Sequence, residues 1–155
     1  MKVKDIMTAN PRTCTPQTTL AEAAQLMWEG DCGMLPVVGD ANRLVGVVTD
    51  RDLFMALGTR NARASELTVG AVATQKPATS TPDADIHAAL STMKEARVRR
   101  LPIVADGGTV TGVLSMNDVV LEAGTSQGRG RDAVIETLQA ICAHQQYPAT
   151  RAVGA

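Results

Sequence analysis

The chain has 155 residues, of which 45% are hydrophobic and 2% aromatic, and its 15 basic and 16 acidic residues give a formal charge of −1. This balance excludes a broad electrostatic attraction to nucleic acid or anionic lipid, and so few aromatic residues cannot form a platform that stacks bases. No apolar run approaches the ~20 residues that span a bilayer, and the N-terminus lacks the apolar stretch of a secretory signal. We therefore expect a soluble, cytoplasmic protein with no nucleic-acid or membrane partner.

The first elements along the chain are an extended segment and a helix. Residues 12–15 are predicted to be extended because Pro16, which follows them, disfavours the helical conformation of the residue before it. Thr19 and Glu22 have the spacing of a capping box, and apolar residues recur after them at helical spacing. Gly30 is placed to end this helix.

A hairpin and a second helix are expected next. Residues 35–38 and 44–48 are rich in β-branched side chains and flank a Gly-Asp-Ala-Asn-Arg segment, which is a hairpin signal. A short helix is predicted over about residues 51–57, with Gly58 beyond its end. The polar residues 58–68 then predict a short solvated linker.

The second half of the chain repeats the first at an offset of 66 residues, since residues 3–57 align without a gap with residues 69–123. The pairs Pro11/Pro77, Pro36/Pro102 and Asp52/Asp118 are among the identical ones, so we infer a duplication. Each copy has the order β-α-β-β-α. The second copy is therefore predicted to hold an extended segment at 78–81, a helix near 86–96, strands at 101–104 and 110–114, and a helix near 117–123.

One copy alone is marginal for a stable core, so the two copies are expected to pack sheet to sheet as a pseudo-twofold pair of the α/β (α+β) class. Residues 124–130 predict a flexible break, residues 147–155 a poorly ordered tail, and residues 132–146 a helix. The expected division is residues 1–66 for the first repeat with its linker, 67–124 for the second, and 125–155 for the break, helix and tail. The apolar stripe of that helix is Val134, Ile135, Leu138, Ile141 and Cys142.

The cysteines and histidines give no pattern typical of a metal site or a disulfide scaffold. Cys14, Cys32 and Cys142 lack a C-x-x-C spacing and are interpreted as small buried or half-buried thiols; a redox pair between Cys14 and Cys32 stays open. His87 and His144 are single histidines on predicted helices. With no nucleophile–base constellation and no P-loop, neither an enzyme, a metal site nor a required cofactor is expected.

One heptapeptide pattern occurs in both copies, as Gly46-Val47-Val48-Thr49-Asp50-Arg51-Asp52 and Gly112-Val113-Leu114-Ser115-Met116-Asn117-Asp118. A hydroxyl at the start of a helix can contact a phosphate or base beside the helix N-terminus, and an aspartate one turn later can accept bonds from both hydroxyls of a ribose. The pattern therefore suits a ribonucleotide. It also matches a capping box that needs no ligand, and both interpretations stay open.

The two heptapeptides, with Leu35-Pro36-Val37-Val38 and Leu101-Pro102-Ile103-Val104, resemble CBS domains, the regulatory modules named after cystathionine β-synthase. The resemblance covers most of the chain, which looks like a stand-alone bacterial pair of such domains. It implies two clefts between the copies, in which Asp52 and Asp118 would hold the ribose while Thr49 and Ser115 contact the nucleotide. The adenine pocket would be lined by Thr13, Thr15, Thr79 and Thr81.

The residues before the Leu-Pro strands would face the phosphates, and they differ between copies. The second copy has Arg99 and Arg100, whereas the first has Gly33 and Met34 at the equivalent positions. Two permanently ionised donors suit phosphate, although solvated surface arginines are the plain alternative. The clefts should then differ in affinity or ligand, and which cleft the arginines serve stays open.

The function expected from this resemblance is a non-enzymatic regulatory module that senses an adenine nucleotide such as AMP, ADP, ATP or NAD. A homodimer and a regulated protein partner are expected with it. The alternative is a nucleotide-independent interaction module, with the motifs serving only as caps and the function carried by dimer or partner contacts.

Overall fold

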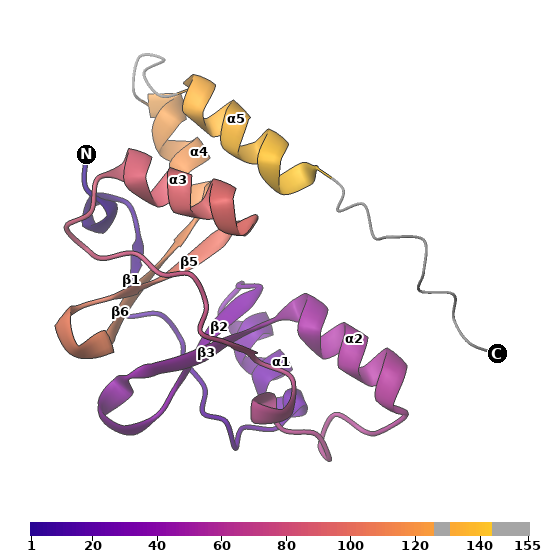
Figure 1. Cartoon of the computed structure of the whole chain (residues 1–155). Coiled ribbons are helices and arrows are strands. Elements are labelled where there is room, and N and C mark those ends of the chain that lie inside the picture. Colours follow the sequence, from indigo (N-terminus) through magenta and orange to yellow (C-terminus); the bar gives the residue numbers. More distant parts are fainter. Residues whose placement is uncertain (126–130, 144–155) are drawn as a thin grey trace.

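The two repeats fold into two three-stranded sheets with helices on their outer sides (Figure 1). The computed structural model describes residues 1–125 and 131–143. The predicted tail, His144 and most of the predicted break lie outside the described residues. No helix within the described ranges is long and apolar enough to cross a bilayer.

The first repeat contains the elements that the sequence predicts, in the predicted order. They are α1 (Leu20–Glu29), β2 (Met34–Val38), β3 (Leu44–Thr49) and α2 (Asp50–Arg60). The capping box of α1 is formed, since Glu22 N donates to Thr19 Oγ1 at 3.2 Å and Thr19 N donates to Glu22 Oε2 at 2.8 Å, and Gly30 caps the other end. The bond from Thr19 N, followed by one from Thr19 Oγ1 to Glu22 Oε2 at 2.9 Å, lowers the pKa of the Glu22 carboxyl.

The end of α2 differs from the prediction. The helix continues through Gly58 and stops at Asn61, which takes a left-handed conformation with φ of 46°. An exposed glycine inside a helix costs only about 1 kcal/mol, and asparagine accepts the left-handed cap. Gly58 is therefore not the stop signal that it resembled.

The second repeat reproduces the first at the offset of 66 residues. Its elements are α3 (Ile86–Ala96), β5 (Arg100–Val104), β6 (Val110–Ser115) and α4 (Met116–Thr125). Two 3-10 turns occupy the hairpin loops, at Asp40–Asn42 and Asp106–Gly108. The predicted duplication is thus confirmed element by element, and α4 extends two residues into the predicted flexible break.

Each sheet is completed by a two-residue strand from the other repeat. β1 (Thr8–Ala9) pairs with β6, and β4 (Thr74–Gln75) pairs with β3. Val3, before β1, is fully buried in the core of the second repeat, whereas Val69, before β4, is fully buried in that of the first. The exchange ties the two repeats together.

Charge also fixes the N-terminus to the second repeat. Lys4 Nζ and Lys2 Nζ lie 2.8 and 3.0 Å from Asp83 Oδ1. The hydrogen bond from Lys4, followed by that from Lys2, lowers the pKa of the Asp83 carboxyl to about 2, and the same contact raises the pKa of Lys4. The first residues are therefore held against the second repeat.

The segment expected to be a short solvated linker is mostly exposed, as predicted, but Ala64 and Leu67 also pack on the first repeat. Leu20 N donates to Leu67 O at 2.9 Å and Ala21 N donates to Ala64 O at 3.1 Å, and both acceptor residues are partly buried against the core. The sequence did not predict this packing, which occurs because the segment leads into β4 on the sheet of the first repeat and its few apolar residues face that core.

The two sheets face each other, as expected. Leu35 and Val37 point into the core of the first repeat, so Pro36, which is also fully buried, points to the opposite face of β2. Pro102 is its buried counterpart on β5. In Figure 1 the helices lie at the two outer ends and the strands between them.

A last helix, α5 (Arg131–Cys142), packs along α3 and breaks the twofold pattern (Figure 1). Val134 and Thr137 are buried, and Lys94 Nζ of α3 lies 3.3 Å from Glu136 Oε2. The predicted stripe is wrong at Ile135, which is 54% exposed, because at 3.6 residues per turn it lies about 100° around the helix from Val134. Cys142 is also exposed, and residues 144–146 of the predicted helix lie outside the described ranges.

Candidate functional site

Each heptapeptide spans the junction between a strand and the helix after it. In the first repeat the backbone N and the Oγ1 of Thr49 both donate to Asp52 Oδ2 at 2.8 Å, and Asp52 N donates back to Thr49 Oγ1 at 3.2 Å. In the second, Ser115 and Asp118 make the same three bonds at 2.8, 2.8 and 3.3 Å. Both motifs are therefore capping boxes.

The capping boxes leave one carboxylate oxygen of each aspartate uncommitted. Only Oδ2 of Asp52 and of Asp118 takes part in the cap, and no hydrogen bond among the described residues reaches either Oδ1. Both side chains are half-buried and line a cleft. A cap and a ligand contact are thus compatible on one carboxylate.

The larger cleft, named here the Asp52 cleft, has a volume of about 700 Å³. Residues 49–52 of the first repeat form one side, and residues 76–78 and 96–100 of the second repeat form the other, with Ile141 and Cys142 of α5 at its edge. This volume lies in the range of about 300–1,000 Å³ that is usual for small-molecule sites. Both repeats are needed to form it.

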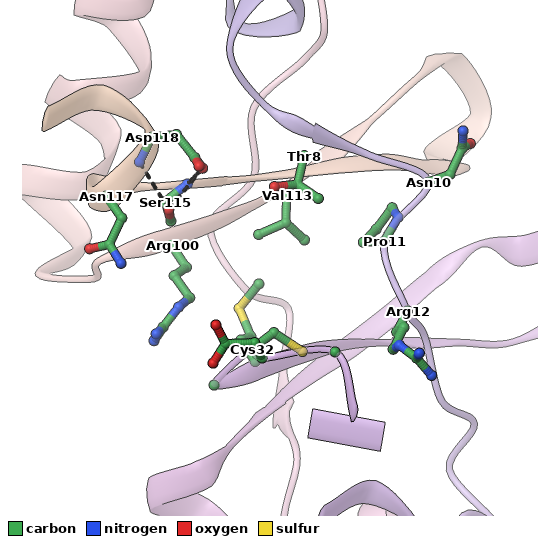
Figure 2. A pocket seen from close by; sticks show the side chains of 14 residues that line it. Thr8, Asn10, Pro11, Arg12, Cys32, Arg100, Val113, Ser115, Asn117 and Asp118 are labelled. Carbon is green, nitrogen blue, oxygen red and sulfur yellow. Dashed lines mark hydrogen bonds between the residues drawn. The ribbon is translucent and has the colours of Figure 1, made fainter. Parts of the chain in front are cut away.

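The smaller cleft, the Asp118 cleft, is its pseudo-twofold counterpart, with a volume of about 360 Å³ (Figure 2). Ser115, Asn117 and Asp118 of the second repeat line it, together with residues 10–12 and 30–34 of the first. In Figure 2, Arg100 extends from the start of β5, beside Ser115 of β6, toward the side of the cleft where Cys32 lies. The volume of the Asp118 cleft is also just large enough for a small ligand.

The two clefts differ strongly in charge. Five basic side chains line the Asp52 cleft against two acidic ones, Asp50 and Asp52. The Asp118 cleft has two of each sign, and its Arg12 is already paired with Glu29 at 3.4 Å. The Asp52 cleft is therefore the better environment for an anion. Its basic residues are Arg51, Lys76, Arg97, Arg99 and Arg100.

These positions answer the question that the sequence left open for the two arginines. Arg99 lines the Asp52 cleft, whereas Arg100 and Met34 line both clefts. Sequence reasoning missed Lys76 and Arg97 as cleft residues. At the 66-residue offset the counterpart of Lys76 is Asn10. The exchanged strands that bring these two segments to the clefts carry no recognisable sequence pattern, so neither residue could be assigned to a cleft.

The threonines expected around the adenine occupy extended segments beside the first strand of each repeat. Cys14 N donates to Pro36 O at 3.0 Å, and Ser80 N donates to Pro102 O at 3.2 Å, so these segments run parallel to β2 and β5. Thr79 lines a separate shallow cavity of about 280 Å³ with Val45 and Lys76. Thr13, Thr15 and Thr81 are not among the residues that line either cleft, and their contact with a ligand stays a prediction.

The three cysteines are free and have different environments. Cys14 is buried, and burial raises the pKa of its thiol from 9.0 to about 11. Cys32 is half-buried in the Asp118 cleft and Cys142 is exposed beside the Asp52 cleft. Within residues 1–125 and 131–143 no group of three or more histidine, cysteine or acidic side chains is placed to hold a metal ion.

Comparison with known proteins defines the class. The model of the CBS domain matches residues 3–59 and residues 69–123, which is more than half of the chain. The protein therefore belongs to the CBS domain family and contains a tandem pair of these domains.

Two relatives match along most of their length. The uncharacterized protein YlbB of Bacillus subtilis (strain 168) is 33% identical over 130 residues, which is 83% of this chain and 86% of YlbB. Hypoxic response protein 1 of Mycobacterium tuberculosis (strain ATCC 25618 / H37Rv) is 32% identical over 139 residues, covering 90% of this chain and 92% of that protein.

Solved structures share the fold. The crystal structure of hypoxic response protein I with two coordinated zinc ions has a TM-score of 0.71 at 31% identity and covers 78% of this chain and 98% of that one. The crystal structure of CBSX2 in complex with AMP has a TM-score of 0.68 at 32% identity and covers 80% of this chain and 96% of CBSX2. An adenosine ligand is thus known in a structural relative of this chain.

Proposed function

We propose that the protein is a non-enzymatic regulatory module that senses an adenine nucleotide, such as AMP, ADP, ATP or NAD, in the clefts between its two CBS repeats. The observation that carries the proposal is the uncommitted Oδ1 of Asp52 and of Asp118, each at a helix N-terminus in a cleft. The complex of CBSX2 with AMP supports this ligand class.

In the proposed binding mode the carboxylates of Asp52 and Asp118 accept hydrogen bonds from both hydroxyls of a ribose. Hydrogen bonds to an ionised acceptor are the stronger kind. A deoxyribose loses one of these bonds, and a 2′-phosphate brings a negative charge to the carboxylate. AMP should therefore bind more tightly than dAMP, and NAD more tightly than NADP.

Binding is transmitted through the packing of the two repeats. Both clefts are lined by residues of both repeats, so a ligand contacts both sides at once. A ligand that binds one arrangement of the repeats better shifts the population toward it. We further propose that the module forms a homodimer, acts in the cytoplasm and signals to a protein partner, with residues 1–66 and 67–124 as its two repeat units.

Calorimetric titration with AMP, ADP, ATP, NAD, dAMP and NADP tests the proposal. Asp52→Asn and Asp118→Asn should each weaken AMP binding in one cleft by about 10-fold or more, since a bond to a charged group contributes about 1.5–3 kcal/mol. Asp40→Asn and Asp106→Asn are matched controls, because these aspartates are equivalent by the repeat and lie on exposed hairpin turns outside both clefts.

The outcomes separate two levels of the proposal. The absence of binding by any adenosine ligand at millimolar concentration would rule out the nucleotide sensor. Normal binding by the double variant Asp52→Asn/Asp118→Asn, or equal affinities for AMP and dAMP, would leave the sensor standing but contradict the ribose assignment.

The second candidate is a nucleotide-independent interaction module, favoured by apolar side chains on the helical surface. Trp28, Phe54 and Leu121 are 85%, 74% and 73% exposed, and exposed apolar clusters commonly mark interaction surfaces. Under this alternative the affinity for a partner is the same with and without AMP or ATP, and Asp52→Asn leaves it unchanged. Dependence on nucleotide favours the sensor.

A further inference from the structure

Arg100 is the charged side chain that lines both clefts. It is the first residue of β5 and pairs with Ser115 on β6, so its side chain starts beside the motif of the Asp118 cleft. Figure 2 shows the guanidinium of Arg100 extending from β5 toward the first repeat, on the side where Cys32 lies. No ion pair engages it among the described residues.

The repeat supplies no second arginine at the equivalent place. The counterpart of Arg100 is Met34, which pairs with Thr49 as Arg100 pairs with Ser115 and is buried. The counterpart of Arg99 is Gly33. Two clefts therefore share a single guanidinium at their common boundary.

Gly33 is the residue that makes room for this guanidinium. A Cβ built at Gly33 would lie 3.1 Å from Arg100 Nη2 and 2.7 Å from Asp50 Oδ2. Gly33 does not have a positive φ, so close approach of side chains, and not backbone conformation, accounts for a glycine here. The side chain of Arg100 thus reaches past its own repeat to the boundary with the first.

The remaining charges are distributed unequally around Arg100. Without it the Asp52 cleft still has four basic side chains, whereas the Asp118 cleft has only Arg12, which is paired with Glu29. A chain of phosphates needs several cationic donors, so it fits the Asp52 cleft. A ligand with at most one phosphate fits the Asp118 cleft.

We propose that the Asp52 cleft takes an adenosine polyphosphate, that the Asp118 cleft takes an adenosine ligand with at most one phosphate, and that Arg100 contacts the phosphate of only one ligand at a time. This inference rests on the proposed function and adds the ligand class of each cleft. Because one guanidinium serves two sites, filling either cleft weakens binding in the other, and the effect is reciprocal. A bond from a charged donor corresponds to a factor of about 10 or more in affinity.

ATP and AMP are the probes, and calorimetry on the full-length protein is the measurement. Asp118→Asn weakens the Asp118 cleft and leaves the Asp52 cleft intact, and Asp52→Asn does the reverse. We expect the preference for ATP over AMP to be at least about 10-fold greater in the Asp52 cleft than in the Asp118 cleft. In the unmodified protein the product of the association constants for ATP and AMP bound together should be about 10-fold smaller than the product of two single constants, that of ATP for the Asp52 cleft and that of AMP for the Asp118 cleft, each measured in the variant that leaves the cleft intact.

Two exchanges between the repeats identify Arg100 as the cause. Arg100→Met installs the residue that the first repeat carries, and it should abolish the coupling and weaken AMP in the Asp118 cleft by about 10-fold. Arg99→Gly, which also installs the counterpart, should weaken ATP in the Asp52 cleft only and leave the coupling in place.

The results that overturn the inference differ from those that overturn the proposed function. Independent clefts in the unmodified protein, equal ATP-to-AMP preferences in the two clefts, or coupling that survives Arg100→Met would each refute it while nucleotide binding stands. Lack of ATP and AMP binding in every variant would refute the proposed function and this inference together.

Discussion

The carboxylates of Asp52 and Asp118 combine two roles that the sequence alone presented as alternatives. Oδ2 of each side chain closes a capping box, and Oδ1 is left for a ligand. The pattern of residue types predicted both the cap and the candidate site. It could not predict that they coexist, because the two oxygens of one carboxylate are equivalent in a sequence and differ only once the helix is in place.

The cap makes a prediction about stability that is independent of any ligand. Thr49→Ala removes the hydroxyl that accepts from Asp52 N and donates to Asp52 Oδ2, so it should lower the free energy of unfolding by about 0.5–2 kcal/mol. Urea denaturation without nucleotide measures it. Thr59→Ala on the same helix is the control and should be nearly neutral, because alanine is the better helix former. Equal losses in both variants would contradict a specific capping role.

Cys14 predicts a pH dependence of stability on the alkaline side. Its thiol pKa is raised to about 11 in the folded state, so between pH 9 and 11 the unfolded chain releases a proton that the folded chain keeps. Stability contributed by this site is complete below about pH 9 and falls as the pH rises, by about 2–3 kcal/mol in all at 1.36 kcal/mol per pKa unit.

Urea denaturation at pH 8.5, 10 and 11 checks the slope. Cys14→Ala should flatten it, whereas Cys142→Ala, at an exposed thiol, should leave it unchanged. A slope that persists in Cys14→Ala would assign the pH dependence to other groups.

At the scale of elements, the sequence predicted the long and strongly patterned segments well. The helix α3 has the predicted bounds, and both hairpins lie where β-branched runs flank turn residues. The two exchanged strands were missed because a two-residue strand has no periodicity to detect. Their partners lie in the other repeat, so nothing in the neighbouring sequence indicates the pairing.

The strand exchange predicts which fragments of the chain fold. A fragment of residues 1–66 ends before Val69 and β4, which belong to the core and sheet of the first repeat, so we expect it to be unfolded. Burial of Val69 alone contributes about 1.5–3 kcal/mol. The matched fragment of residues 10–76 contains both elements and omits the segment that packs on the second repeat. It should show more secondary structure by circular dichroism and a cooperative urea transition. The reverse order of stability would contradict the exchange.

At the scale of the whole molecule, the two repeats differ in their outer surface as they do in their clefts, because α5 packs on the second repeat only. On α3, Leu90 is 4% exposed in the core that also includes Val134 of α5, and Lys94 pairs with Glu136. Their counterparts on α1 are Ala24, which is exposed, and Trp28, which is 85% exposed. In the second repeat α5 covers the outer face of α3, whereas the corresponding face of α1 in the first repeat is exposed. The difference arises because α5 belongs to the part of the chain that follows the duplicated region.

This uncovered face is where we expect two copies of the chain to associate. Trp28 on α1 and Phe54 on α2 are the most exposed large apolar side chains of the first repeat, and α1 packs against α2. Tryptophan is prominent among the residues that contribute most to interface affinity. Because Trp28 is the single tryptophan of the chain, its emission should shift to shorter wavelength as the protein concentration rises and water leaves the ring.

Sedimentation velocity over the same concentrations gives the mass of the species. Trp28→Lys installs the residue that the second repeat carries at this position and should hold the protein as a monomer, because a charged side chain resists burial without a partner. Leu121→Lys on α4, at a side chain that is 73% exposed, is the matched control and should leave the association intact. A monomer at every concentration would contradict association through this face, and so would a dimer that Leu121→Lys disrupts while Trp28→Lys does not.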